Sequence, residues 1–365
     1  MAKKIFISAT SQDSGKTTTS LSLLYQARQR YERIGFIKPI GPKPIDYLGR
    51  RIDTDPAMIA QVYGLEHLID DMCPVVIERG MTLQVIEGKI AVADLEQRIL
   101  RAVERLDRAC DFLIVEGAGH SGVGSVLGLS NARVAALVGA PVLMVTGGGL
   151  GNVVDAVCMN LSLYREAGAE VRLLVANKLL PEKREKTLEN LRLAFSGAGF
   201  AVHGGFNYQP VLANPTLKRI ADVLGVEARA TANELMRIIH QVQIGAAATQ
   251  RVVDMLHDDT LLLVTSSRDE LLITLANLYT VPEYHRKIAG LVIPGGPPIA
   301  TITQRILDTS GIPYLRTTRR TDHVFLDIHE DVSKLTAEDA EKIALIQQLA
   351  GKRFDFDYLE QLFSP

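Results

Sequence analysis

The chain has 365 residues, of which 47% are hydrophobic and 22% charged, and its mean hydropathy is +0.11. These values are typical of an ordinary globular protein, long enough for two or three domains with substantial cores. The formal net charge of −2 argues against recruitment of nucleic acid or of an anionic membrane by a global field.

The cysteines and the apolar segments indicate in which cellular compartment the protein works. Cys73, Cys110 and Cys158 are far apart, which predicts neither a disulfide framework nor a zinc site and fits a reducing environment. No apolar run approaches the length of a membrane span, and the stretch after Lys3 and Lys4 is too short for a signal peptide. We therefore expect a cytoplasmic protein without a membrane partner.

The most informative segment, residues 5–18, reads IFISATSQDSGKTT, and a helical pattern of apolar residues follows it. Strand, loop and helix in this order are typical of a phosphate-binding loop, although Thr10 stands where the general motif has its first glycine. Lys16 would reach the β- and γ-phosphates, and Thr17 would ligate Mg²⁺. The residues expected to hold the nucleotide are Asp13, Ser14, Gly15, Lys16, Thr17 and Thr18.

Strand-like and helix-like segments alternate over the first 210 residues or so. This alternation predicts the α/β class, with a doubly wound parallel sheet covered by helices on both faces. The clearest helical face carries Val92, Leu95, Ile99, Val103 and Leu106. The expected strands are Ile5–Ser8, Ile34–Lys38, Asp111–Glu116, Val142–Thr146, Val171–Asn177 and Phe200–Gly204.

A proline-containing stretch near residue 212 indicates a domain boundary. We expect a nucleotide-binding domain over 1–212, then linker helices and a smaller α/β domain over 213–365. A linker helix is predicted from the helical spacing of Leu235, Ile238, Ile239 and Val242. The later strands are expected at Thr260–Thr265, Ile288–Ile293 and Ile312–Thr317, and the helices at Glu270–Leu278, Ile299–Thr309 and Glu338–Leu349.

Charged residues at strand ends are candidates for catalysis and metal binding. Glu116 ends an apolar strand before a Gly-Ala-Gly turn and would hold Mg²⁺; a solvated glutamate beside a flexible turn is the alternative. Lys38 would bind an anionic substrate or stabilise phosphoryl transfer, and the alternative is a surface lysine. Asp55, near a predicted helix start at Pro56, either contacts the metal or only caps the helix.

Asn177 ends a later strand, where its amide can read a purine edge. Guanine-specific proteins usually carry an Asp two positions beyond the following Lys, and this chain has Leu180 there. The pattern therefore favours adenine, and an ordinary turn-forming Asn is the alternative.

Together these residues resemble the dethiobiotin synthetase family, whose branch of ATP-dependent carboxylate chemistry includes the cobyrinic acid a,c-diamide synthases. The resemblance covers roughly residues 1 to 210 and implies ATP and Mg²⁺ as cofactors. Residues 9–12 read ATSQ where that family has Gly-Thr-Asp-Thr, so we expect nucleotide binding but not the family's own substrate. The implied roles are phosphate and Mg²⁺ binding for Lys16 and Thr17, metal contact for Asp55 and Glu116, substrate carbamate and γ-phosphate contact for Lys38, and adenine reading for Asn177.

The second domain resembles the DRTGG domain, through Arg268 after one predicted strand and Gly295-Gly296 after another. A synthetase-like domain followed by a DRTGG domain resembles the N-terminal regulatory half of long phosphate acetyltransferases. The acetyltransferase domain is not expected here, since the chain ends at Pro365. The resemblance implies a small ligand at Arg268, Gly295 and Gly296; from the residues alone, a substrate lid or a dimerisation domain is the alternative.

Two functions follow from these patterns. The first is a Mg-ATP-binding regulatory or sensor protein that signals through its DRTGG-like domain to a partner enzyme. The alternative is a ligase-like enzyme that activates a small carboxylate by γ-phosphoryl transfer. Acetyl transfer by this chain alone is not expected, and a homodimer is expected by analogy.

Overall fold

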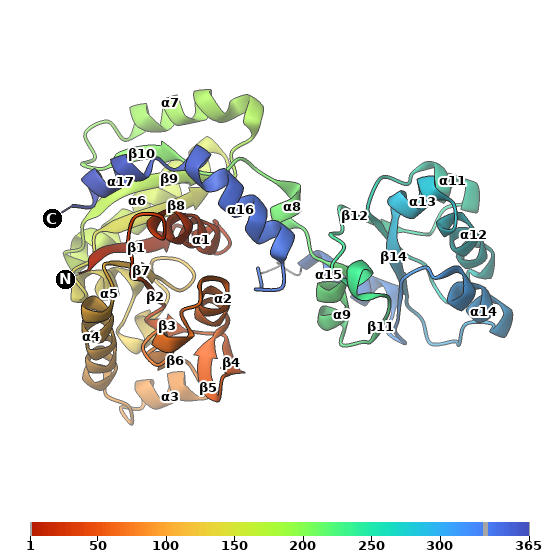
Figure 1. The fold of residues 1–365 in the computed structure, drawn as a ribbon, viewed down its shortest axis with the longest axis horizontal. Helices are drawn as coiled ribbons and strands as arrows, with labels where there is room; N and C mark the ends of the chain where they lie inside the picture. The colour runs from red at the N-terminus through yellow and green to blue at the C-terminus, as the bar shows by residue number, and fades with distance from the viewer. Residues whose placement is uncertain (1, 331–334, 365) are drawn as a thin grey trace. The chain divides into compact units, whose positions relative to one another are not determined.

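The computed structural model describes residues 2–330 and 335–364. Contacts divide the chain into two compact units (Figure 1). Unit 1 runs to Gln209 and resumes at Leu335, whereas unit 2 begins at Pro210. Unit 2 is therefore inserted between two parts of unit 1.

A parallel six-stranded sheet forms the centre of unit 1, in the strand order β10-β9-β8-β1-β7-β2. Each neighbouring pair in it runs parallel, which confirms the predicted α/β class. The six predicted strands are present, with ends that differ by at most two residues. Their bounds are β1 (Lys3–Ala9), β2 (Ile34–Ile37), β7 (Phe112–Glu116), β8 (Val142–Gly147), β9 (Val171–Asn177) and β10 (Ala201–Gly204).

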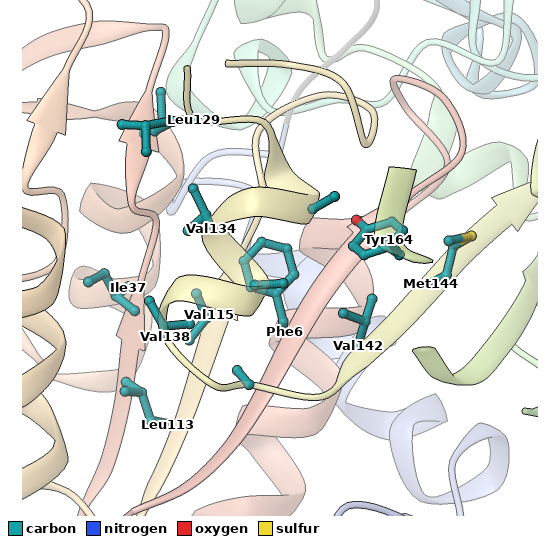
Figure 2. Close-up of a cluster of buried hydrophobic side chains, with 14 of the residues drawn as sticks. Phe6, Ile37, Leu113, Val115, Leu129, Val134, Val138, Val142, Met144 and Tyr164 are labelled. Atoms are coloured by element: carbon teal, nitrogen blue, oxygen red, sulfur yellow. The ribbon is translucent and has the colours of Figure 1, made fainter. Parts of the chain in front are cut away.

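Burial on both faces explains the composition of the central strands. All five residues of β7, which reads FLIVE, are buried, as expected for an inner strand of a parallel sheet. Phe6 of β1 packs in the same core as Val115, Val142 and Tyr164 (Figure 2). The register pairs Ile7 with Glu116, so β1 and β7 end side by side and the loops that follow them start together.

Helices and two small sheets complete unit 1. The predicted apolar face of α4 is confirmed, because Leu95, Ile99, Val103 and Leu106 are buried. The first helices are α1 (Lys16–Ala27), α2 (Thr54–Tyr63), α3 (Met81–Ile86), α4 (Val92–Ala109), α5 (Asn131–Leu137), α6 (Leu150–Ala167) and α7 (Arg184–Ala194). The small sheets pair β3 (Ile40–Gly41) with β6 (Val75–Val76) and β4 (Pro44–Tyr47) with β5 (Arg50–Asp53), and the 3-10 helices are η1 (Glu66–Leu68), η2 (Ser125–Leu127) and η3 (Pro181–Lys183).

Unit 2 contains a five-stranded sheet in the order β11-β15-β14-β13-β12, in which β11 alone runs antiparallel to its neighbour. Its strands are β11 (Ala228–Arg229), β12 (Gln241–Ile244), β13 (Thr260–Leu263), β14 (Ile288–Ile293) and β15 (Tyr314–Arg316). Its helices are α8 (Pro210–Ala213), α9 (Leu217–Leu224), α10 (Ala232–Leu235), α11 (Thr249–Asp254), α12 (Asp269–Tyr279), α13 (Pro282–Lys287), α14 (Thr301–Ser310) and α15 (Thr321–Glu330). Among the described residues, no helix combines the length and apolarity needed to cross a membrane.

The helix predicted from Leu235 to Val242 is wrong. The α10 helix ends at Leu235, Ile238 forms an isolated antiparallel bridge with Thr216, and Val242 lies in β12. Four apolar residues over so short a span fit an extended segment as well as a helix, and pairing with β13 decides between them.

The division of the chain also differs from the expected 213–365 domain. Residues from Leu335 onward belong to unit 1 and form α16 (Ala340–Arg353) and α17 (Phe356–Leu362). Both helices contact α1, and Figure 1 shows them beside it. The helix predicted at Glu338–Leu349 is present, but it belongs to unit 1 and packs against α1.

An aromatic cluster holds the C-terminal helices to unit 1. The Phe356 ring lies 5.6 Å from that of Phe112 on β7, and Tyr31 stacks on Phe112 at 5.3 Å between centroids. The Arg30 guanidinium lies 5.2 Å from the Phe356 ring centroid. Because Phe356 is buried, this cluster removes a large apolar area from water.

We expect Phe356→Ala to destabilise unit 1 by about 3 kcal/mol, because it leaves a cavity against Phe112. Tyr358→Ala on the same helix is the control, since Tyr358 is 40% exposed. Hydrogen exchange of β1 and β7 peptides in increasing denaturant measures the free energy of unfolding of this unit. Equal effects of the two substitutions would show that the helix does not pack as described.

Candidate nucleotide-binding site

The loop between β1 and α1 has the backbone form of an anion cradle. Asp13 and Gly15 adopt positive φ angles of 56° and 99°. The α1 helix begins at Lys16, and among the described residues no side chain caps it. The first N–H groups of a helix have no intrahelical partner, so those of α1 and its dipole favour a bound anion.

Asn177, at the end of β9, is hydrogen-bonded to this loop. Its Nδ2 donates to the carbonyl of Ser14 at 2.9 Å, and its Oδ1 accepts from the N–H of Phe206 at 2.8 Å. A Cβ added to Gly15 would come within 2.1 Å of the same Nδ2. The amide therefore positions the loop, and adenine reading by Asn177 stays a prediction.

Glu116 lies beneath the first turn of α1. Its Oε1 accepts from the Thr17 hydroxyl at 3.1 Å, and its Oε2 accepts from the Ser20 hydroxyl at 2.5 Å. Glu116 is only 1% exposed, so the alternative of a solvated glutamate is wrong. Burial raises the pKa of its carboxyl, and the neighbouring Asp55 carboxylate raises it further, against the opposing effect of Lys38. Sequence reasoning missed Ser20, although it follows Thr17 by one helical turn.

Lys16 connects the phosphate-binding loop to the turn after β7. Its Nζ donates to the carbonyl of Gly119 at 2.5 Å, and burial lowers the pKa of its ammonium group. Asn131 holds this turn, since its Oδ1 accepts from Ala118 N at 3.1 Å and its Nδ2 donates to the Ala118 and His120 carbonyls. The sequence motifs did not indicate Asn131, because it lies in α5, outside the phosphate-loop and strand-end motifs.

Lys38 is a buried lysine held between two carboxylates, so the alternative of a surface lysine is wrong. Its Nζ lies 2.7 Å from Asp53 Oδ1 and also contacts Asp55 Oδ2. Burial acts to lower the Lys38 pKa, but the Asp55 and Asp53 carboxylates outweigh it and raise the pKa. The cap of α2 is Asp53, which accepts from the N–H of Asp55, whereas Asp55 lies in the first turn.

These groups fit Mg-ATP. The loop N–H groups and Lys16 suit phosphate oxygens, while the Thr17 hydroxyl and the Glu116 and Asp55 carboxylates are oxygen ligands of the kind Mg²⁺ prefers. Within residues 2–330 and 335–364, no group of three or more His, Cys, Asp or Glu could hold a metal ion by itself.

In unit 2 the predicted ligand residues lie after neighbouring strands. Arg268 donates through Nη1 and Nη2 to the carbonyls of residues 245–247, which follow β12, and through Nε to Glu270. Gly295, after β14, has a φ of 121°. Gly296 follows it in the same turn. Arg268 thus fastens a loop, and a ligand at these three residues stays a prediction.

Comparisons with known proteins agree with this geometry. The AAA_26 family, described as an AAA domain, matches residues 3–216. Phosphate acetyltransferase of Nitratidesulfovibrio vulgaris is 22% identical over 366 residues, which cover 97% of this chain and 51% of that protein. ATP-dependent dethiobiotin synthetase BioD of Idiomarina loihiensis is 25% identical over 187 residues, or 51% of this chain and 84% of that protein.

The chain thus spans about half the length of the phosphate acetyltransferases that it matches. Among solved structures, the CBS and DRTGG domains of the regulatory region of Clostridium perfringens pyrophosphatase align at 15% identity and a TM-score of 0.26. The alignment covers 38% of this chain and 61% of that one. A TM-score this low carries no argument about the fold.

Gly15→Ala is expected to weaken Mg-ATP binding by about tenfold or more, because the loop needs a positive φ and leaves no room for a methyl group. Gly351→Ala is the control, since a Cβ there meets nothing within 4 Å and α16 tolerates alanine. Isothermal titration calorimetry measures both dissociation constants. Wild-type affinity in Gly15→Ala would exclude this loop as the binding element.

Asp53→Asn is expected to destabilise unit 1 by about 3 kcal/mol, because it removes one carboxylate from a buried lysine. Asp46→Asn on the same hairpin is the control and is expected to change stability by less than about 0.5 kcal/mol, since its side chain is 79% exposed. The same hydrogen-exchange measurement on β1 and β7 reports both values. Similar effects would mean that the Lys38 contacts do not contribute to stability.

Proposed function

The chain belongs to the AAA_26 family of AAA domains over residues 3–216, and from this premise we propose that unit 1 binds Mg-ATP as part of a regulatory protein. The observation that carries the proposal is the contact of Thr17 with Glu116 beside the uncapped start of α1. It places a hydroxyl and a carboxylate together next to an anion cradle, as a phosphate-bound Mg²⁺ requires.

Each residue of the site has a role in this proposal. The loop from Asp13 to Thr18 and the Lys16 ammonium bind the phosphates. Thr17, Glu116 and Asp55 hold Mg²⁺, which supplies charge neutralisation at the phosphates when it is bound. Asn177 holds the loop in shape, and its amide is the candidate adenine reader.

A regulatory role is favoured by what the chain resembles. It matches about half of much longer phosphate acetyltransferases and carries a second α/β unit with a DRTGG-like glycine turn at Gly295-Gly296. We propose that unit 2 binds a small regulatory metabolite and that the nucleotide state of unit 1 is passed to a partner enzyme. A cytoplasmic homodimer is part of the same proposal.

The ligase-like alternative draws support from a different observation. Lys38 is buried among Asp53, Asp55 and Glu116, so its charge acts in a poorly solvated site. A fixed cation of this kind can stabilise charge that develops during γ-phosphoryl transfer to a carboxylate. This chemistry would use the same Mg-ATP and one further substrate.

Mg-ATP binding and hydrolysis by the whole chain test the proposal, with a panel of carboxylates added and withheld. Lys16→Ala is expected to weaken binding by about ten- to a hundredfold, because it removes a charge-assisted contact to phosphate. Lys186→Ala, an exposed lysine on α7, is the control.

The outcomes separate the two functions. Tight binding without stimulated turnover supports the regulatory protein, whereas turnover that rises with one carboxylate and disappears in Lys16→Ala supports the ligase. Absence of Mg-ATP binding by the wild-type chain would contradict both.

A further inference from the structure

A second hollow lies in unit 1, apart from the phosphate loop, and we call it the basic pocket. Its volume is about 770 Å³, within the range of small-molecule sites. Its described walls come from β5, the segment around β6, α3 and the first half of α4. Lys16, Thr17 and Glu116 are not among its lining residues, so it is distinct from the nucleotide site.

Positive charge dominates the lining, with five Arg or Lys side chains against three Asp or Glu. Arg50 pairs with Asp70 at 2.9 Å, and Arg51 pairs with Glu78 at 3.1 Å. Within the described part of the chain, the guanidinium groups of Arg79 and Arg98 have neither an ion pair nor a hydrogen bond. Two cations at the pocket are therefore available to an anion.

Part of the pocket lining is apolar. Ile69, Val76 and Ile90 line the pocket and are only partly buried, so they present apolar surface to it, whereas the lining residues Ile52, Leu95 and Cys73 are buried. Burial raises the pKa of the Cys73 thiol to about 12, so the sulfur stays neutral. An inorganic anion would gain nothing from the partly exposed apolar side chains, whereas an apolar body on an anion would displace water from them.

We propose that the basic pocket binds a small organic anion, which places its charged group at Arg79 and Arg98 and its apolar part against Ile69, Val76 and Ile90. Neither the motifs nor the family match assigns this site. The inference does not depend on Mg-ATP binding by the loop.

Two buried lining residues, Ile52 and Cys73, connect the pocket to the cluster around Lys38. Ile52 directly precedes Asp53, which holds Lys38 and caps α2. A Cβ added to Gly41 would lie 2.6 Å from both Cys73 Sγ and Asp53 Cβ, so thiol and aspartate are packed around one glycine. Ile52 and Cys73 both line the pocket. Binding of a ligand there is therefore expected to change the affinity of unit 1 for Mg-ATP by thermodynamic linkage.

The fluorescent probe 1-anilinonaphthalene-8-sulfonate, an aromatic body with one sulfonate, tests the site in the whole chain without nucleotide. We expect saturable binding that the Arg79→Ala/Arg98→Ala double variant weakens by about tenfold or more. Arg101→Ala is the control, because Arg101 is an exposed arginine on α4 outside the pocket. Lys16→Ala is expected to bind the probe like the wild type, which separates this site from the loop.

Competition for the bound probe identifies the chemistry. Octanoate is expected to displace it, whereas octanol, which lacks the charge, and inorganic phosphate, which lacks the apolar body, are expected to be at least tenfold weaker. Wild-type probe affinity in the double variant would overturn the proposal. Equal displacement by octanoate and octanol, or loss of probe binding in Lys16→Ala, would overturn it as well.

Discussion

The burial of Glu116 beneath α1 is the constraint on which the rest of the site depends. A carboxylate removed from water is costly unless it is hydrogen-bonded or paired with positive charge. Thr17 and Ser20 supply the hydrogen bonds, and they lie one helical turn apart near the start of α1. The helix start is therefore fixed against the end of β7, which fixes Gly15 and Lys16 with it.

The buried charges do not balance among themselves. Lys16 and Lys38 stand against Asp53, Asp55 and Glu116, and all five side chains are buried. Three carboxyl groups against two lysines is a costly arrangement for a protein interior unless a carboxyl takes up a proton, as the raised pKa of Glu116 favours, or a further cation binds. The divalent ion proposed beside Thr17 would offset this negative charge.

The sequence was informative where local pattern and tertiary fold agree. Apolar strands such as β7 and the Gly-Lys-Thr loop have a signature within a few residues, so they were predicted at nearly their observed positions. Asp53, Ser20 and Asn131 act through hydrogen bonds to residues distant in the chain or through burial, which no short motif records. The helix α16 was predicted, but its amphipathic pattern is the same whichever sheet it covers. Its contacts with α1 in the folded chain show that it belongs to unit 1.

The inserted position of unit 2 has a consequence for how the chain is made. Unit 2 is contiguous and can collapse as soon as it has been synthesised, whereas unit 1 needs α16 and α17, which are translated after unit 2. Contacts such as Arg30 with Glu360 close a loop of more than 300 residues, and loop closure over such a distance is slow and entropically costly. Until α16 and α17 have been translated, unit 1 lacks the packing of Phe356 on Phe112. A ribosome that stalls within unit 2 would leave that apolar surface open to chaperones and to aggregation.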